Sequence, residues 1–302
     1  MSLESSREST ANQLDIGKEQ LAKTTPYSRN PEEIRSMLHD IVDSQSYLYI
    51  DKSTNPAIDD MSIYRIDSRD RHADIGRTLE AQVFNKDAGY EPEFIEEKFS
   101  PYDKNSIFFV LVENEPSEDP QSIGVLRTID CNRGSSETIS MFKEFYGEET
   151  PLPLELSMKN SGEKVWDIFT VVVDPRYRDG TNSAWLYHAL YKMSVEEGID
   201  RWISNITPKE IRNLRHYLGI PFIDVPGVDP VFDIMPNGSR SDYGFYYADV
   251  KDVGPAVAER IEYLKSSLED DKVSEKEKRM NALLSQIASV ALKGSLLDTA
   301  QE

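Results

Sequence analysis

The chain is poor in cysteine and in positive charge, and its few histidines are dispersed. A single cysteine, Cys131, excludes an internal disulfide framework and a zinc site built on several thiolates within one chain. The four histidines are scattered without the spacing of metal ligands, so we predict no metal site. The formal net charge of −20 argues against broad binding to nucleic acid or to anionic membranes, because both would be repelled.

Long apolar segments are also absent. No apolar run reaches the roughly 20 residues needed to span a bilayer, and the first residues, MSLESSREST, lack the charged-then-apolar pattern of a signal peptide. A cytoplasmic protein is therefore expected. The 302 residues allow one large domain or one and a half ordinary ones, and a hydrophobic content of 38% is enough to build a packed core.

Four parts can be distinguished along the chain. Residues 1–28 are polar and nearly free of aromatic side chains, so we expect them to be unordered. Residues 29–60 are expected to form a helical extension, because NPEEIRSMLHDIVDS carries a strong helix start. Residues 61–252 alternate strand and helix patterns and form the main domain. Residues 253–302 carry two helical patterns, which fit either a hairpin packed on the main domain or an arm that joins two copies in a homodimer.

The most informative stretch is VDPRYRDGTNSAWLYHAL, residues 173–190, where a predicted strand leads through small residues into a predicted helix. The first backbone N–H groups of a helix have no intrahelical acceptors, and together with the helix dipole they form an anion site. Small residues let a phosphate approach this backbone closely, and the arginines supply charge. The predicted cofactor-binding residues are Val171, Val173, Arg176, Arg178, Asp179, Gly180, Thr181, Asn182 and Ser183.

Two common phosphate-binding motifs are missing from this junction. It contains neither the Gly-Lys-Ser/Thr of a P-loop nor the G-x-G-x-x-G of a dinucleotide-binding fold. The alternative interpretation is an ordinary helix start with Asn182 as its cap. The junction alone does not separate the two.

The order of the predicted elements resembles the GCN5-related N-acetyltransferase superfamily. Its pyrophosphate loop commonly reads Val-x-Pro-x-Tyr-Arg and then Arg-x-x-Gly-x-Gly/Ala. This chain matches the pattern at Val173, Pro175, Tyr177 and Arg178. Thr181 and Ser183 stand where the family usually has two glycines. The resemblance implies an α/β (α+β) fold with a mixed, mostly antiparallel central sheet flanked by helices.

Two blocks are similar to the acyl-homoserine-lactone synthases and long-chain N-acyl amino acid synthases of that superfamily. One runs from Glu80 to Ile129 and the other is VWDIFTVVVDPRYR, and the whole resemblance covers roughly residues 61–250. Asp167 stands where these synthases have glutamate, whereas Thr170 and Glu80 replace arginines. The resemblance implies an N-acyltransferase with an acyl-CoA or acyl carrier protein thioester as cosubstrate, a small-molecule amine as acceptor and no permanently bound cofactor.

Acyl transfer to an amine needs a base for the amine proton, a donor for the oxyanion and an acid for the leaving thiolate. Asp167 is the predicted base, and a strand residue bonded to a neighbouring strand is the alternative. In many members of the family, the acid is a tyrosine on the helix that follows the next strand after the phosphate-binding loop. Here Arg215 stands at that position and Tyr217, two residues later, is the candidate.

Three further residues are predicted on the substrate side. They are Asp103, Arg127 and Phe169. The alternative for Asp103 is a helix-capping or turn role. For Arg127 it is a solvent-facing position on the sheet, and for Phe169 it is the core. Strict alternation along the strand would put Asp167, Phe169 and Val171 on one face. For the whole chain, the alternative function is a catalytically inactive binding or regulatory module, because the replaced glycines and the displaced tyrosine permit it. A structural protein built on the C-terminal helices is a further alternative.

Overall fold

The computed structural model describes most of the chain. The described ranges are residues 25–50, 61–114, 118–157, 162–178, 180–267, 280–281 and 283–285. Most of the predicted unordered segment, most of the predicted second C-terminal helix and the loop residue Asp179 lie outside these ranges.

The described strands form one mixed sheet in the order β1-β2-β3-β4-β5-β6-β9-β7, with β8 paired to β9. They are β1 (Leu48–Ile50), β2 (Met61–Asp67), β3 (Ser106–Glu113), β4 (Gln121–Asp130), β5 (Val165–Val173), β6 (Arg201–Ile206), β7 (Ile223–Asp224), β8 (Val231–Ile234) and β9 (Arg240–Asp249). Only the β5–β6 pair is parallel among these strands. The predicted mixed, mostly antiparallel sheet is confirmed.

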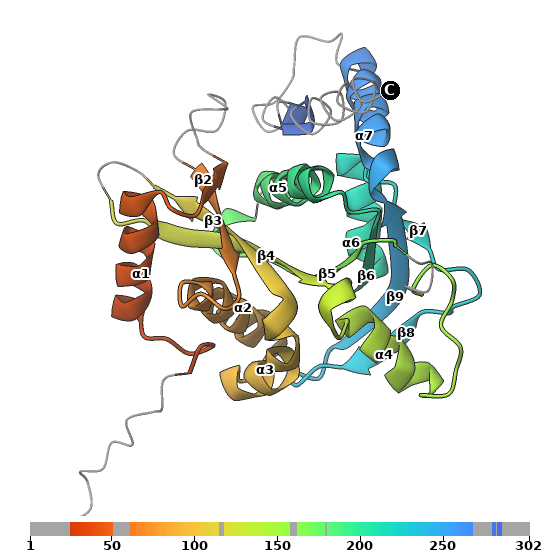
Figure 1. The fold of residues 1–302 in the computed structure, drawn as a ribbon, viewed down its shortest axis with the longest axis horizontal. Coiled ribbons are helices and arrows are strands. Elements are labelled where there is room, and N and C mark those ends of the chain that lie inside the picture. Colours follow the sequence, from red (N-terminus) through yellow and green to blue (C-terminus); the bar gives the residue numbers. More distant parts are fainter. Residues whose placement is uncertain are drawn as a thin grey trace, which may run out of the picture.

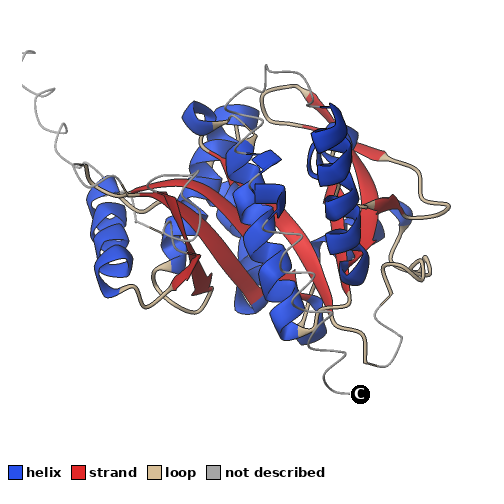
Figure 2. Ribbon diagram, turned by 90° about the horizontal axis from the view of Figure 1, so that it is seen from above, coloured by secondary structure: helices blue, strands red, loops and turns tan. Residues whose placement is uncertain are grey.

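Helices cover both faces of this sheet (Figures 1 and 2). They are α1 (Pro31–Ser44), α2 (Ala73–Ala88), α3 (Pro92–Phe99), α4 (Glu137–Tyr146), α5 (Thr181–Glu197), α6 (Pro208–Asn213) and α7 (Val250–Ser267). Short 3₁₀ turns η2 (Ser100–Asn105), η3 (Cys131–Arg133) and η4 (Pro175–Tyr177), and a π-helical turn η5 (Leu214–Leu218), lie between them. One face carries α5 and α7, and the other carries α1, α2, α3 and α4.

The predicted helix boundaries follow from local chemistry. Asn30 and Glu33 form a reciprocal capping box at the start of α1. Gly89 ends α2 with φ of 77°, a left-handed conformation that glycine adopts without steric cost. Ser136 caps α4, since its hydroxyl accepts a hydrogen bond from the backbone N–H of Ile139.

The N-terminal part of the domain differs from the prediction in two places. Residues 48–50, expected within a helical extension, form β1 and pair with β2. Residues 25–28, expected to be unordered, are placed against the domain. Tyr27 is 1% exposed, and its hydroxyl donates to the Asp103 carboxylate at 3.0 Å. Long-range contacts of this kind carry no local sequence signal.

The helix α7 packs into the largest hydrophobic core. Val253, Val257 and Ile261 are buried in the same cluster as Trp185 and Leu190 of α5. The apolar stripe of α7 thus faces the domain. The separability of the C-terminal extension and its role as a dimerisation arm both stay predictions.

We accordingly expect Ile261→Ala to lower the free energy of unfolding by about 2–5 kcal/mol, because it leaves a cavity in the core. Glu259→Ala, at an exposed position of the same helix, should change it by less than about 0.5 kcal/mol. Urea denaturation measures both. Equal stabilities of the two variants would mean that α7 is only loosely attached, as a separable extension would be.

A β-bulge interrupts β5 in the middle. Arg127 of β4 pairs with Thr170, but its neighbour Thr128 pairs with Ile168, so Phe169 is an extra residue. The bulge changes which side chains share a face. Val171 packs toward the α5 side of the sheet, whereas Phe169 and the consecutive Thr170 both lie on the opposite side. The predicted common face of Asp167, Phe169 and Val171 is therefore wrong for Val171.

The sheet opens directly beyond this bulge. The parallel pairing of β5 with β6 is limited to residues 165–167 and 201–203. From residue 168 onward β5 pairs only with β4, and from residue 204 onward β6 pairs only with β9 among the described strands. Figure 2 shows the strands in two groups. The two central strands thus diverge toward their carboxyl ends.

Candidate active site

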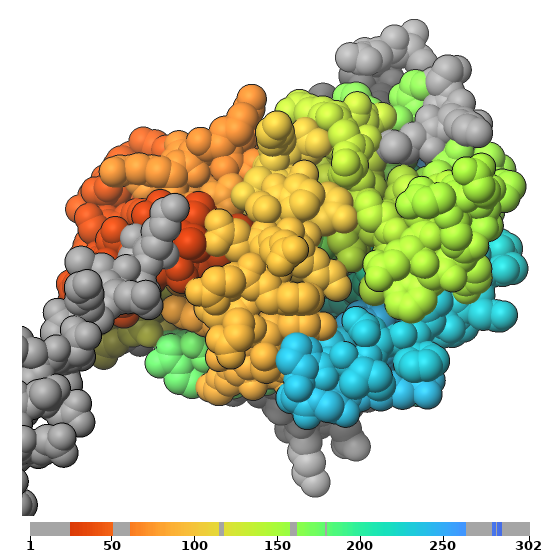
Figure 3. Space-filling model, turned by 90° about the horizontal axis from the view of Figure 1, so that it is seen from below, coloured from red at the N-terminus to blue at the C-terminus, as the bar shows by residue number. Residues whose placement is uncertain are grey.

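A pocket of about 90 Å³ lies at this opening, on the face that carries α3 and α4. It is lined by Phe84, Tyr90, Phe94, Ile95, Lys98, Phe99, Glu137, Met141, Phe169, Thr170, Asn205 and Tyr243. Figure 3 shows that the segments of α3, α4 and β8–β9 meet on this face of the molecule. Most of the lining is aromatic or aliphatic, so the few polar groups in it determine its chemistry.

Glu137, the first residue of α4, is the acidic group of this pocket. The residue is only 7% exposed, and its Oε2 has no hydrogen-bond partner in the described part of the chain. Burial raises the pKa of this carboxyl to about 8, and repulsion by Asp167 adds to the shift. Lys98 and a hydrogen bond with Asn205 act in the opposite direction. A carboxyl group with such a pKa changes its protonation near neutral pH.

Asp167 is fully buried and holds the amino end of α4. Its Oδ2 accepts hydrogen bonds from the Ser136 hydroxyl at 2.7 Å and from the Thr138 backbone N–H at 2.8 Å. Its Oδ1 accepts from the Thr138 hydroxyl at 2.7 Å. Burial raises the pKa of Asp167, although these hydrogen bonds oppose the shift. Asp167 is not part of the pocket lining, so its role as the base stays a prediction.

Arg127 lies inside the domain and is 0% exposed, so the alternative of a solvent-facing sheet arginine is wrong. Its guanidinium donates to the Ser106 hydroxyl at 2.9 Å and to the Tyr27 hydroxyl at 3.1 Å. It also pairs with Asp103 at 2.7 Å and with Glu80 at 3.5 Å. With these partners in place, Arg127 and Asp103 belong to an internal ion network, and substrate binding by either stays a prediction.

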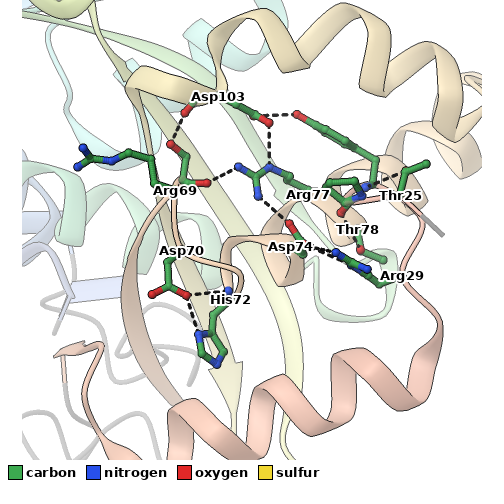
Figure 4. A network of polar contacts seen from close by, with 12 residues as sticks. Thr25, Arg29, Arg69, Asp70, His72, Asp74, Arg77, Thr78 and Asp103 are labelled. Carbon is green, nitrogen blue, oxygen red and sulfur yellow. Dashed lines mark hydrogen bonds and ion pairs between the residues drawn. The ribbon is translucent and has the colours of Figure 1, made fainter.

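The network extends outward from Asp103. Figure 4 shows Arg77 between Asp74 and Asp103, and Arg29 on the other side of Asp74. Arg77 contacts Asp74 at 2.7 Å and Asp103 at 3.1 Å, and Arg29 contacts Asp74 at 2.7 Å. The segment before α1 is thereby tied to α2. The buried charges compensate one another rather than facing a cavity.

The predicted phosphate-binding loop joins β5 to α5. Asn182 does not cap this helix, contrary to the alternative interpretation. The cap residue of α5 is Gly180, with φ of 88° and no side chain that can accept the first N–H groups. Asn182 lies within the helix, where its amide donates to the Tyr177 carbonyl at 2.8 Å. The Ser183 hydroxyl donates back to the Gly180 carbonyl at 3.0 Å. Gly180 therefore provides no side chain of its own to cap the helix, and small residues surround the first turn, as an anion site favours.

Both arginines of this loop are paired with acidic residues. Arg176 contacts Asp174 at 2.9 Å, and Arg178 contacts Asp87 at 2.5 Å while donating to the Val173 carbonyl at 2.8 Å. The side chains of Val171 and Val173 pack against the apolar core, which leaves only their backbone for a ligand. A phosphate at this loop would have to replace carboxylates as the partner of the arginines.

Tyr217 lies on η5 and is 56% exposed. It lines a separate surface hollow together with Arg212, Arg215 and His216, and it is absent from the pocket that contains Glu137. Arg215 is occupied by the Phe222 carbonyl at 2.7 Å and by Asp224 at 2.8 Å. The assignment of Tyr217 as the acid stays a prediction that this geometry does not favour.

Phe169, a predicted substrate-side residue, does line the pocket, whereas its polar lining residues Glu137, Lys98 and Asn205 were not predicted. A glutamate in the first turn of a helix is common, because it complements the helix dipole. Glu137 therefore has no distinguishing local signal. Its burial beside the diverging strands depends on the packing of α4 against β5 and β6.

No protein-family model and no curated protein sequence matches this chain. Among solved structures, it is similar to FeeM, an N-acyl amino acid synthase from uncultured soil microbes, with 15% identity over 65% of this chain and 95% of that one, and a TM-score of 0.43. It is also similar to MesI, a CoA-dependent acyl-homoserine lactone synthase, with 10% identity over 74% and 95% and a TM-score of 0.41. A third is the ribosomal-protein-S18-alanine N-acetyltransferase from Escherichia coli, with 12% identity over 63% and 94% and a TM-score of 0.38. At such distances, the functional conclusion has to depend on the chain's own strands and pocket.

Proposed function

We propose that this protein is an N-acyltransferase of the GCN5-related superfamily, which transfers an acyl group from a CoA or acyl carrier protein thioester to the amine of a small molecule. The observation that carries the proposal is the place where β5 and β6 part. Phe169 and Thr170 on one side of the opening and Asn205 on the other all line the same pocket. An extended donor lying between the strands would bring its end to that pocket.

The open edge of β5 supports the proposed binding of the acyl donor. Beyond residue 167 this edge has no strand partner within the described ranges, although the Ser204 hydroxyl donates to the Ile168 carbonyl at 2.9 Å. The pantetheine arm of CoA and of carrier proteins contains two amide groups. Amide groups can pair with an open strand edge, as an added peptide strand does.

The phosphate groups of the donor are assigned to the start of α5. β5 leads directly through η4 into this helix, so a donor that lies along β5 reaches the first N–H groups of α5. Gly180, at the cap position, has no side chain that would keep a phosphate away from those groups. The combination of strand edge and helix start matches a ligand with an amide-containing arm and a pyrophosphate.

Two measurements test the function. Thermal shift with free CoA, acetyl-CoA and a long-chain acyl-CoA should show stabilisation of the protein, because a ligand that binds only the folded state raises the melting temperature. A thiol-release assay with a panel of amines should then show acyl transfer. Binding without transfer would favour the inactive binding module, and no shift with any of the three compounds would contradict the donor site.

We expect Ser183→Leu to weaken CoA binding about tenfold or more, because the larger side chain obstructs the approach of a phosphate to the α5 backbone, where charge-assisted hydrogen bonds contribute roughly 1.5–3 kcal/mol. Thr181→Val should have a smaller effect. Glu197→Leu adds the same side chain at the exposed far end of α5 and should leave the affinity unchanged. Calorimetry with CoA measures all three. Unchanged affinity in Ser183→Leu would remove the loop from the donor site.

A further inference from the structure

The pocket contains a buried polar atom that the donor does not explain. Glu137 is more than nine-tenths buried, and its Oε2 lacks a hydrogen-bond partner in the part of the chain that the structure describes. Leaving a buried acceptor unpaired costs free energy, roughly 1–3 kcal/mol for a neutral group and more for a charged one. Such an atom at the wall of a pocket indicates a ligand that supplies a hydrogen-bond donor.

We propose that Glu137 binds the ammonium group of the acceptor substrate and takes the proton that this group must lose before acyl transfer. The inference deepens the proposed function and depends on it. It also names the class of acceptor: an alkyl- or arylammonium compound whose apolar body lies against the aromatic wall of the pocket.

The lining of the pocket supports this class. Tyr90 and Phe94 stack with their ring centroids 5.0 Å apart, and Phe99 and Phe169 meet edge to face at 4.5 Å. These rings offer an apolar surface beside one acidic group. Because an ammonium ion is strongly hydrated, it enters such a site only where a carboxylate replaces its water.

The neighbours of Glu137 come from several elements. Lys98 of α3 lowers its pKa, whereas Asp167 of β5 and Glu144 of α4 raise it. Tyr102 of η2 and Tyr243 of β9 also interact electrostatically with Glu137, and burial is the main reason that the pKa of both phenols lies above its usual value. Asn205 of β6 contacts the carboxyl as a neutral hydrogen-bond partner. The negative charges of Asp167 and Glu144 favour the protonated form of Glu137. A bound cation would favour the carboxylate form instead.

The proposed reaction consumes an ammonium ion and a thioester. The ammonium ion bound to the Glu137 carboxylate transfers one proton to Oε2, and the free amine nitrogen attacks the thioester carbonyl carbon. The N–C bond forms, the C–S bond breaks, and the thiol leaves as thiolate. The second proton lost by the nitrogen goes to this thiolate, and Glu137 releases its own proton to solvent. An ammonium ion and a thioester thus yield an amide, a thiol and one proton.

The test uses the full-length protein saturated with free CoA, which fills the donor site without reacting. The probes are 2-phenylethylamine and n-hexylamine, each paired with the neutral alcohol of the same shape, and binding is measured by calorimetry at pH 7. A carboxyl with a pKa of about 8 is mostly protonated at this pH, and binding of an ammonium ion requires the carboxylate. We therefore expect at least one amine to bind with release of about one proton, seen as a dependence of the binding enthalpy on the buffer. The alcohols should bind about tenfold more weakly or not at all.

Glu137→Gln is nearly isosteric and should abolish the proton release and weaken amine binding about tenfold or more. Glu148→Gln, at an exposed position just beyond the same helix, should retain both properties. Alcohols that bind as tightly as amines, proton release that persists in Glu137→Gln, or the failure of both amines to bind would each overturn the inference. If the wild-type protein did not bind CoA, the proposed function would be contradicted. This result differs from those that overturn the role of Glu137, so the two hypotheses can fail separately.

Discussion

Asp167→Asn is expected to lower the maximal rate of acyl transfer by on the order of a hundredfold, the usual scale for a positioned base or for loss of its support. CoA affinity should barely change, because Asp167 lies on the α4 side of the sheet, whereas α5 lies on the other. The rate is measured by thiol release at saturating acyl-CoA. A variant with the turnover of the wild type would remove Asp167 from the reaction altogether.

Two different roles of Asp167 could cause this loss of rate. In one, it is the base itself, as the sequence predicts. In the other, it positions Glu137, because the three hydrogen bonds that it accepts come from Ser136 and Thr138, the two residues on either side of Glu137. An asparagine would present an NH₂ group to one of these donors and loosen the start of α4.

The pH profile separates the two roles. If Asp167 is the base, Asp167→Asn should lose the acid limb of the profile, and Glu137→Gln should retain it. If Glu137 is the base, the acid limb should remain in Asp167→Asn and move to lower pH. The sign follows from charge: Asp167 helps to raise the pKa of Glu137, so its neutralisation lowers that pKa. The geometry favours the second result.

Arg127→Met is expected to reduce the free energy of unfolding by about 3–5 kcal/mol, the scale for removing one partner of a buried ion pair. The methionine fills much of the space, but it leaves the carboxylates of Glu80 and Asp103 without their shared cation. Since domains are stable by only about 5–15 kcal/mol, the variant would be close to unfolding at room temperature. Urea denaturation measures the change.

Arg133→Met is the matched control. Arg133 also pairs with an aspartate, Asp130, at 2.8 Å, but 63% of its side chain is exposed. Exposed ion pairs contribute little, so its loss should change the stability by less than about 1 kcal/mol. A similar stability for both variants would mean that the internal network does not support the fold, and would favour the predicted role of Arg127 in substrate binding.

The order and type of most elements could be predicted from the amino-acid sequence. The continuous apolar run of β3, the capping box of α1 and the glycine that ends α2 are local signals, and each element forms where its signal predicts. The small residues between β5 and α5 likewise predicted a strand-to-helix junction. These features depend on neighbours within a few residues, which the sequence contains in full.

The set of side chains that share the pocket depends instead on contacts between segments that are distant in the sequence. The bulge at Phe169 reverses the alternation of β5, and nothing in the local sequence marks it. Glu137 resembles any first-turn glutamate until α4 packs beside Asn205. Arg127 resembles an exposed sheet arginine until Tyr27, one hundred residues earlier, covers it. Burial, pKa and strand divergence arise from contacts between distant segments, because desolvation depends on everything that surrounds a group and not on its neighbours in the chain.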